Sequence, residues 1–246
     1  MSGKLYLVAT PIGNLEDITF RALRTLKEVD LIAAEDTRNT LKLLNHYEIT
    51  KPLISYHRHN EEIKKDNLID KLKNGENIAI VTDAGTPGIS DPGEVIVKEA
   101  IENNIEVISI PGACAAINAL ICSGLDTKEF VFLGFLPINK KLRKIKLEEI
   151  KNENKTLILY EAPHKMKETL QDLKSILDNR KVVLARELTK IHEEFIRGNI
   201  DEVISKSENI KGEMILVIEG CEKVEKESEL NNLSLDEHYN FYERQG

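Results

Sequence analysis

The segment 83–93, DAGTPGISDPG, concentrates residue types that could surround a small ligand. Its three glycines let a ligand approach the backbone closely, and its two prolines hold the loop rigid. Two aspartates add negative charge. A plain connection between a strand and a helix does not need so many special residues, so we predict a ligand-binding loop here. For the other strand-following loops taken singly, an ordinary tight turn is the better interpretation.

Two charged clusters hold the candidates for acid–base chemistry. One contains Glu35, Asp36 and Arg38, directly after an apolar segment. The other contains Arg186, Glu187, Lys190, Glu193 and Glu194. A positioned carboxylate can act as a general base. Solvated helix faces and ion pairs explain either cluster equally well, and both interpretations stay open.

Several common kinds of site are not indicated. The chain has no GxxxxGK[ST] motif, and no GxGxxG follows its first predicted strand, so ordinary nucleotide fingerprints are absent. His57 and His59 have no cysteine or acidic pattern beside them that would complete a metal site. The three cysteines show no CxxC spacing, and we predict free thiols, with Cys114 and Cys122 buried, in a reducing cytoplasm.

Short apolar runs that alternate with helical patterns must position these residues. Strands are predicted at 4–10, 30–34, 78–82, 105–110, 130–135, 156–160, 182–186 and 214–218. A helix is predicted over 61–73, and another is expected to open at Asp91-Pro92, with Asp91 as N-cap. The alternation predicts an α/β fold with a largely parallel sheet, in which ligands bind beyond the carboxyl ends of the strands.

The number of strands exceeds what one simple sheet needs. We predict one α/β lobe over residues 1–112 and a second over 113–221. Residues 222–246 read as a polar linker and the start of a helical tail cut short at Gly246. No apolar run is long enough to span a membrane. The net charge of −8 argues against binding nucleic acid through overall positive charge, but not against a local basic face.

Seven segments in this order resemble a known family. They are VATPIGNLEDIT (8–19), AAEDTR (33–38), TDAGTPGISDPG (82–93), FLGFLP (132–137), YEAPHK (160–165), ARELTKIHEEFIRG (185–198) and KGEMILVIEG (211–220). Together they resemble the small-subunit ribosomal RNA methyltransferases of the tetrapyrrole-methylase superfamily. The resemblance implies two α/β lobes, the second with a mixed sheet, and S-adenosylmethionine held between them. It also implies 2′-O-methylation of a cytidine in the decoding region of 16S ribosomal RNA, by a homodimer acting on the RNA or the 30S particle.

The resemblance also implies which residues contact the cofactor. These are Pro11, Asp83, Ala84, Gly85, Ala115, Ala116, Tyr160, Glu187, Gly212, Glu213 and Met214. Methyl transfer to a ribose hydroxyl benefits from a base, and placement at strand ends favours Glu187, with Asp36 second. We expect Glu187→Gln to bind cofactor and lose methyl transfer.

RNA contacts are expected from aromatic and basic side chains. Tyr56, His57 and Arg58 form one candidate loop, although a surface loop without a partner explains this segment equally well. Arg38 and Lys190 are further candidates. Lys140, Lys141, Arg143, Lys144 and Lys146 offer phosphate contacts, although an ordinary solvated helix competes with that interpretation.

Two alternative functions are kept. One is methylation of a tetrapyrrole, which the acidic charge favours and the segments EDTR and DAGTPGISDPG disfavour. The other is a non-catalytic ribosome-binding assembly protein, against which the intact cofactor loops argue.

Overall fold

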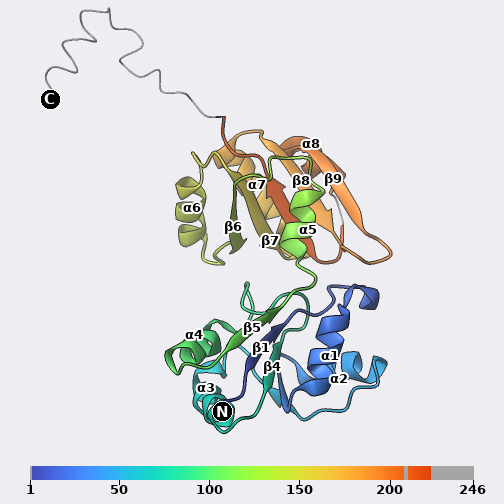
Figure 1. Cartoon of the computed structure of the whole chain (residues 1–246). Coiled ribbons are helices and arrows are strands. Elements are labelled where there is room, and N and C mark those ends of the chain that lie inside the picture. Colours follow the sequence, from blue (N-terminus) through green and yellow to red (C-terminus); the bar gives the residue numbers. More distant parts are fainter. Residues whose placement is uncertain (1, 208–209, 223–246) are drawn as a thin grey trace, which may run out of the picture.

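The chain folds into two α/β lobes, each built on one five-stranded sheet (Figure 1). The computed structural model describes residues 2–207 and 210–222. The predicted fold class is confirmed: the first sheet is wholly parallel and the second is mixed. The interpretation of 222–246 as linker and tail falls, apart from Glu222, outside the described residues.

The first lobe contains strands β1 to β5 in the order β3-β2-β4-β1-β5. Their bounds are β1 Leu5–Val8, β2 Leu31–Ala34, β3 Leu53–Ser55, β4 Ile78–Val81 and β5 Val107–Ile110. The helices are α1 Phe20–Glu28, α2 Thr37–His46, α3 Glu61–Lys73 and α4 Glu94–Glu102, with a 3-10 turn η1 at Leu15–Asp17. Helices α1 and α2 lie on one side of the sheet, and α3 and α4 on the other (Figure 1).

Alternating apolar side chains explain this sandwich. Along β4, Ile78 and Ile80 face the core under α3 and α4, whereas Ala79 and Val81 face the core under α1 and α2. Both faces of the sheet are covered, which is why its strands read as continuous apolar runs.

The second lobe contains strands β6 to β10 in the order β6-β7-β10-β8-β9. Their bounds are β6 Phe130–Phe135, β7 Thr156–Glu161, β8 Lys181–Arg186, β9 Glu194–Asn199 and β10 Met214–Ile218. The helices are α5 Ala115–Ile121, α6 Lys140–Glu149, α7 Met166–Leu177 and α8 Ile200–Lys206, with a 3-10 turn η2 at Pro163–Lys165. Strands β6 and β7 are parallel, and the other neighbours are antiparallel.

Strand β10 separates two apolar cores in this lobe. Met214, Leu216 and Ile218 pack with α6, α7 and α8. Ile215 and Val217 point the other way and pack with α5. Helix α5 therefore covers the face of the second sheet opposite α6, α7 and α8, and Ile12 of the first lobe belongs to the same core.

The boundary after Gly112 stays a proposal. It is supported by the position of β5, which ends at Ile110 in the first sheet, and by the packing of α5 on the second. No helix in residues 2–207 and 210–222 combines the length and apolar character that crossing a bilayer requires.

Two local predictions were wrong. Helix α4 begins at Glu94 with Gly93 as its N-cap, so Asp91 and Pro92 lie in the loop before it. Gly93 has φ +140°, a backbone conformation that glycine adopts without strain, and the loop ends there rather than at the aspartate. All three cysteines are free, but Cys122 is exposed and Cys114 is only partly buried.

Candidate functional site

The connections of the first sheet change direction between β1 and β4. The chain leaves β1 toward α1 on one face, whereas it leaves the neighbouring β4 toward α4 on the other face. In open α/β sheets, ligands bind beyond the carboxyl ends of the strands at such a switch point. The loops after β1 and β4 are therefore the first place to look for a site.

A two-bond bridge joins these two loops. The Thr10 amide donates to the Gly85 carbonyl at 2.9 Å, and the Gly85 amide donates to the Thr10 carbonyl at 3.1 Å. Gly85 has φ +84°, and a Cβ there would lie 3.3 Å from Ile12 Cγ2. The glycine predicted to bind ligand thus also lets the two loops meet closely.

Beside this bridge a cavity of about 390 Å³ opens between the lobes. Its size falls in the range of small-molecule sites, and its lining is mainly apolar. The first lobe contributes Ile12, Ala84, Thr86, Ile89, Ser90 and Asp91. The second contributes Cys114, Ala115, Phe135, Tyr160, Glu161, Ala162, Pro163, Ala185, Leu188, Glu213, Met214 and Ile215.

Tyr160 is fixed in the wall by two phenylalanines. Phe132 and Phe135 meet its ring edge to face, with centroids 5.1 and 5.6 Å away. Burial raises the pKa of Tyr160 to about 12, so its hydroxyl stays neutral at physiological pH. The tyrosine therefore presents a rigid ring and an uncharged hydroxyl to the cavity.

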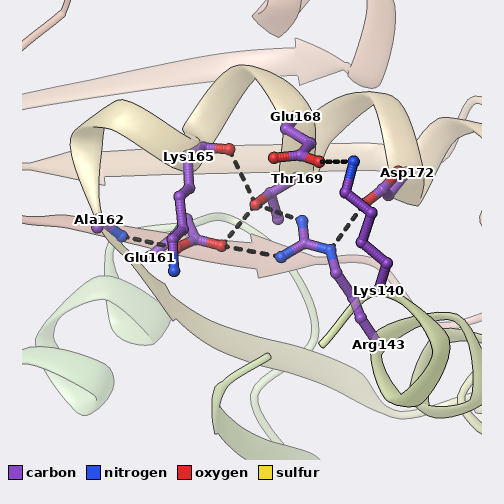
Figure 2. A network of polar contacts seen from close by, with 8 residues as sticks. All are labelled: Lys140, Arg143, Glu161, Ala162, Lys165, Glu168, Thr169 and Asp172. Carbon is purple, nitrogen blue, oxygen red and sulfur yellow. Dashed lines mark hydrogen bonds and ion pairs between the residues drawn. The ribbon is translucent and has the colours of Figure 1, made fainter. Parts of the chain in front are cut away.

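Glu161, the next residue in the wall, is part of a buried polar network that Figure 2 shows. Its carboxylate accepts from Thr169 Oγ1 at 2.5 Å and from the Ala162 amide at 2.8 Å. Arg143 lies 3.7 Å from the same carboxylate, donates to Thr169 at 2.7 Å and pairs with Asp172 at 2.6 Å. The network ties helices α6 and α7 to the end of β7, and so holds this side of the cavity in place.

Asp91 brings a carboxylate with unusual surroundings into the cavity. Its pKa is raised to about 6, mainly by burial and in addition by the charges of Glu35 and Asp83, whereas Arg58 acts in the opposite direction. The ordinary pKa of an aspartate is 3.8, so the fold makes this carboxylate a better proton acceptor than an exposed one. Perturbed carboxyls in clefts are typical of functional sites.

Several residues predicted to hold the cofactor come together in this cavity. Ala84, Ala115, Tyr160, Glu213 and Met214 line it. Pro11 and Asp83 line a second hollow of about 260 Å³ beside the loops after β1 and β4. Ala116 is buried in the core under α5 rather than in the cavity wall. Whether these residues contact a cofactor stays a prediction.

Glu187 and Gly212 form a unit behind Glu213. The Glu187 carboxylate accepts from the Glu213 amide and from Lys190, both at 3.0 Å. A Cβ on Gly212 would lie 2.3 Å from that carboxylate, so the glycine makes room for it. The hydrogen bond from Lys190 lowers the pKa of Glu187. The role of Glu187 as base stays a prediction, but its carboxylate is already occupied.

Asp36 is also occupied. It caps α2 by accepting from the Arg38 amide at 2.8 Å, and it binds the Arg38 guanidinium at 2.6 Å. These hydrogen bonds lower its pKa to about 2, which makes it a weak proton acceptor. Its assignment as second candidate base stays a prediction too.

The residues predicted to contact RNA differ in how exposed they are. Tyr56 was wrongly predicted to stack on RNA: its side chain is 0% exposed and packs in the core with Leu68 and Ile80. His57 is partly buried, and its backbone amide donates to Asn60 at 2.8 Å. Arg58 and Arg38 are exposed, and Lys190 is partly exposed; their contact with RNA stays a prediction.

Arg143 was wrongly grouped with the phosphate-binding side chains of its helix. It is 7% exposed, and its guanidinium donates to Asp172 and Thr169 and lies beside the Glu161 carboxylate. The neighbours Lys140, Lys141 and Lys144 are exposed on α6.

Sequence reasoning missed Asp91 and Glu161 as site residues. Asp91 lay inside the segment 83–93, but it was interpreted as a helix cap. Glu161 directly follows an apolar strand in YEAPHK, and this placement at a strand end was the available signal. Among the described residues, no group of three or more His, Cys, Asp or Glu side chains is arranged to hold a metal ion.

Three features define the class of protein to which the chain belongs: a parallel first sheet with a switch point, a mixed second sheet, and a cavity between the two lobes. Residues 4–204 match the family model described as Tetrapyrrole (Corrin/Porphyrin) Methylases, and the chain belongs to that family. Solved structures agree on the fold. The methyltransferase CobJ gives a TM-score of 0.67 at 14% identity, covering 89% of this chain and 95% of that one. A uroporphyrin-III C-methyl transferase from Thermus thermophilus, complexed with S-adenyl homocysteine, gives 0.60 at 17%, covering 88% and 97%.

Within this family, the sequence relatives of the chain include proteins called ribosomal RNA small subunit methyltransferase I. The relative from Halalkalibacterium halodurans is 56% identical over 96% of this chain and 84% of its own length. The one from Bacillus subtilis is 52% identical over 99% and 85%. The resemblance predicted from the sequence is confirmed.

Proposed function

We propose that this protein transfers a methyl group from S-adenosylmethionine to small-subunit ribosomal RNA. The observation that carries the proposal is identity of 52–56% to ribosomal RNA small subunit methyltransferase I over nearly the whole chain, with the cavity built from the shared lobes. As the finer assignment, we propose the 2′-hydroxyl of a cytidine in the decoding region of the RNA.

The residues of the cavity fit this cofactor. Ala84, Ala115 and Met214 offer a small apolar lining to the adenosine part, and close approach is eased by the alanines. The carboxylate of Glu213 suits the positive charges of the donor. When bound, S-adenosylmethionine supplies an activated methyl group on a sulfonium sulfur.

The chain's own contribution is mainly positioning. The Thr10–Gly85 bridge and the Arg143–Glu161 network fix opposite walls of the cavity, so that a bound donor is held in one orientation. Holding two reactants in line lowers the activation barrier, because the translational and rotational entropy has already been lost on binding. The exposed Arg58 would supply local positive charge for RNA on an otherwise acidic protein, and Arg38 would do so once RNA replaces its partner Asp36.

We further propose that the substrate is the 30S particle, that the protein acts as a homodimer and that it works in the cytoplasm, where ribosomal RNA is modified. Sedimentation of the purified chain tests the dimer.

The activity is tested by incubating the protein with labelled S-adenosylmethionine and 30S particles that lack the modification, and then mass-mapping the RNA. We expect one methyl group on one cytidine ribose. Label on a uroporphyrinogen-type macrocycle instead would support a tetrapyrrole methylase. Absence of donor binding in calorimetry would support a non-catalytic assembly protein.

A further inference from the structure

Methylation of a hydroxyl requires that its proton leave, and three carboxylates line the cavity where the donor is proposed to bind: Asp91, Glu161 and Glu213. A useful acceptor must have an oxygen that is not already saturated by protein donors, and it must hold a proton well near neutral pH. These two requirements separate the three.

Glu161 fails the first requirement, and Glu213 meets it with one of its two oxygens only. Glu161 accepts from Thr169 and from the Ala162 amide, and Arg143 lies beside it. Glu213 pairs with Lys190 at 3.1 Å. For Asp91, the described part of the chain provides no hydrogen-bond donor and no ion-pair partner within contact distance. Of the three carboxylates in the lining, Asp91 is the one with both oxygens left available to a bound substrate.

Asp91 is also held firmly. The Gly88 amide donates to the Pro92 carbonyl at 3.2 Å, which closes the loop around it. A Cβ on Gly93 would lie 3.2 Å from the Gly88 nitrogen, so the two ends of the loop are packed together. Ser90 reaches across to the second lobe, where its Oγ would lie 3.0 Å from a Cβ on Gly134. The aspartate therefore stands on a compact loop at the junction of the lobes.

We infer that Asp91 is the proton acceptor of the methyl transfer, an inference that rests on the proposed function. The acceptor oxygen of the RNA forms a bond to the methyl carbon as the carbon–sulfur bond breaks. The electron pair of that bond stays on sulfur, and the hydroxyl proton passes to an oxygen of Asp91. Charge balances, because the cationic sulfur becomes neutral and the carboxylate becomes a carboxylic acid.

The electrostatic surroundings suit this role. Glu35, Asp83 and Arg58 face Asp91 from the loops after β2, β4 and β3, and Cys114, Tyr160, Glu161 and Glu213 line the same cavity. With its pKa raised to about 6, Asp91 is mostly ionised at pH 7 and still binds a proton far better than an ordinary aspartate. Glu187 and Asp36 have pKa values shifted the other way.

The test compares wild type with Asp91→Asn, Asp91→Glu and the control Asp70→Asn, which changes an exposed aspartate on α3. Single-turnover methylation of 30S particles at saturating donor is measured from pH 5 to 8.5, and donor binding is measured by calorimetry. We expect the wild-type rate to rise through pH about 6 and then level off. Asp91→Asn should bind donor, lose about 10²- to 10⁴-fold in rate and lose the rising limb. Asp91→Glu should restore part of the rate, and Asp70→Asn should match wild type.

Two results would overturn the assignment. In the first, Asp91→Asn keeps a rate within about threefold of wild type together with its pH limb. In the second, it weakens donor binding alone, with the saturated rate unchanged, which would make Asp91 only a counter-charge. Failure of the wild type to methylate 30S particles would instead count against the proposed function itself.

Discussion

Arg143 gives the sharpest test of how the cavity wall is supported. Replacing it by methionine keeps much of the apolar stem but removes the guanidinium that lies between Glu161 and Asp172. Asp172 is partly exposed and can be solvated, whereas Glu161 is 6% exposed and cannot. Breaking a buried pair by removing one partner costs about 3–5 kcal/mol. For a protein of this size that lowers the melting temperature by about 6–20 °C.

The assay is thermal unfolding followed by circular dichroism, with donor affinity measured in parallel. Lys140→Met is the matched control, because Lys140 lies on the same helix and pairs with Glu168 at 3.6 Å (Figure 2). The Lys140 side chain, however, is 90% exposed. The control substitution should cost less than about 1 kcal/mol. Adding Glu161→Gln to Arg143→Met should recover more than about 1 kcal/mol, because the unpaired charge is gone. The reasoning is refuted if Arg143→Met is as mild as the control.

Three further predictions follow from the site. Ala115→Leu fills the cavity and should weaken donor binding at least about tenfold, as measured by calorimetry. The control Ile121→Ala, which changes an exposed residue of the same helix, should leave the affinity unchanged. Equal affinity of the two variants for the donor would show that the donor lies elsewhere. Asp91→Asn should stabilise the fold, because the folded-state pKa of Asp91 is raised from 3.8 to about 6. The ionised group therefore destabilises the fold fully above pH 6 and not at all well below 3.8. The rise in pKa corresponds to about 3 kcal/mol, and solvent screening reduces the expected gain in the free energy of unfolding to about 1–2 kcal/mol at pH 8. The gain should vanish near pH 3. Urea unfolding at both pH values measures it, and a gain of equal size at both would contradict the explanation. Gly85→Ala places a methyl group at φ +84° beside Ile12 and should lower the free energy of unfolding by about 1–3 kcal/mol in the same assay. An unchanged unfolding midpoint would show that the Thr10–Gly85 bridge is not tightly packed.

Of the ten strands in the described part of the chain, eight could be predicted from the sequence, together with the helix over 61–73. Buried strands such as β4 and β10 carry runs of apolar residues, which the pattern reveals directly. The two missed strands, β3 and β9, each lie at one edge of their sheet; the opposite edge strands, β5 and β6, are rich in apolar residues and were predicted. Strand β3 has three residues, and β9 contains Glu194, Arg197 and Asn199. Edge strands are half exposed, so they need no continuous apolar run.

The candidate site was predicted in outline but not in its polar details. Loops rich in glycine, alanine and proline marked the rim, and five of the predicted residues line the cavity. The pairing state of a carboxylate depends on contacts distant in sequence, such as the 47 positions that separate Asp36 from Asp83, which accepts from the Asp36 amide. Likewise, Tyr56 looked like a surface aromatic because nothing local indicates that it packs under α3. Such residues are assigned only once the fold brings their neighbours together.

The composition of the cavity walls has a consequence for stability. Ile12, Ala84 and Asp91 come from one lobe, and Tyr160, Leu188 and Met214 from the other. A molecule that fits between them binds only while both halves are folded and apposed, so its binding energy adds to the cohesion of the whole chain. At a hundred times its dissociation constant, the donor would contribute about 2.7 kcal/mol, and the halves would then melt closer to a single transition.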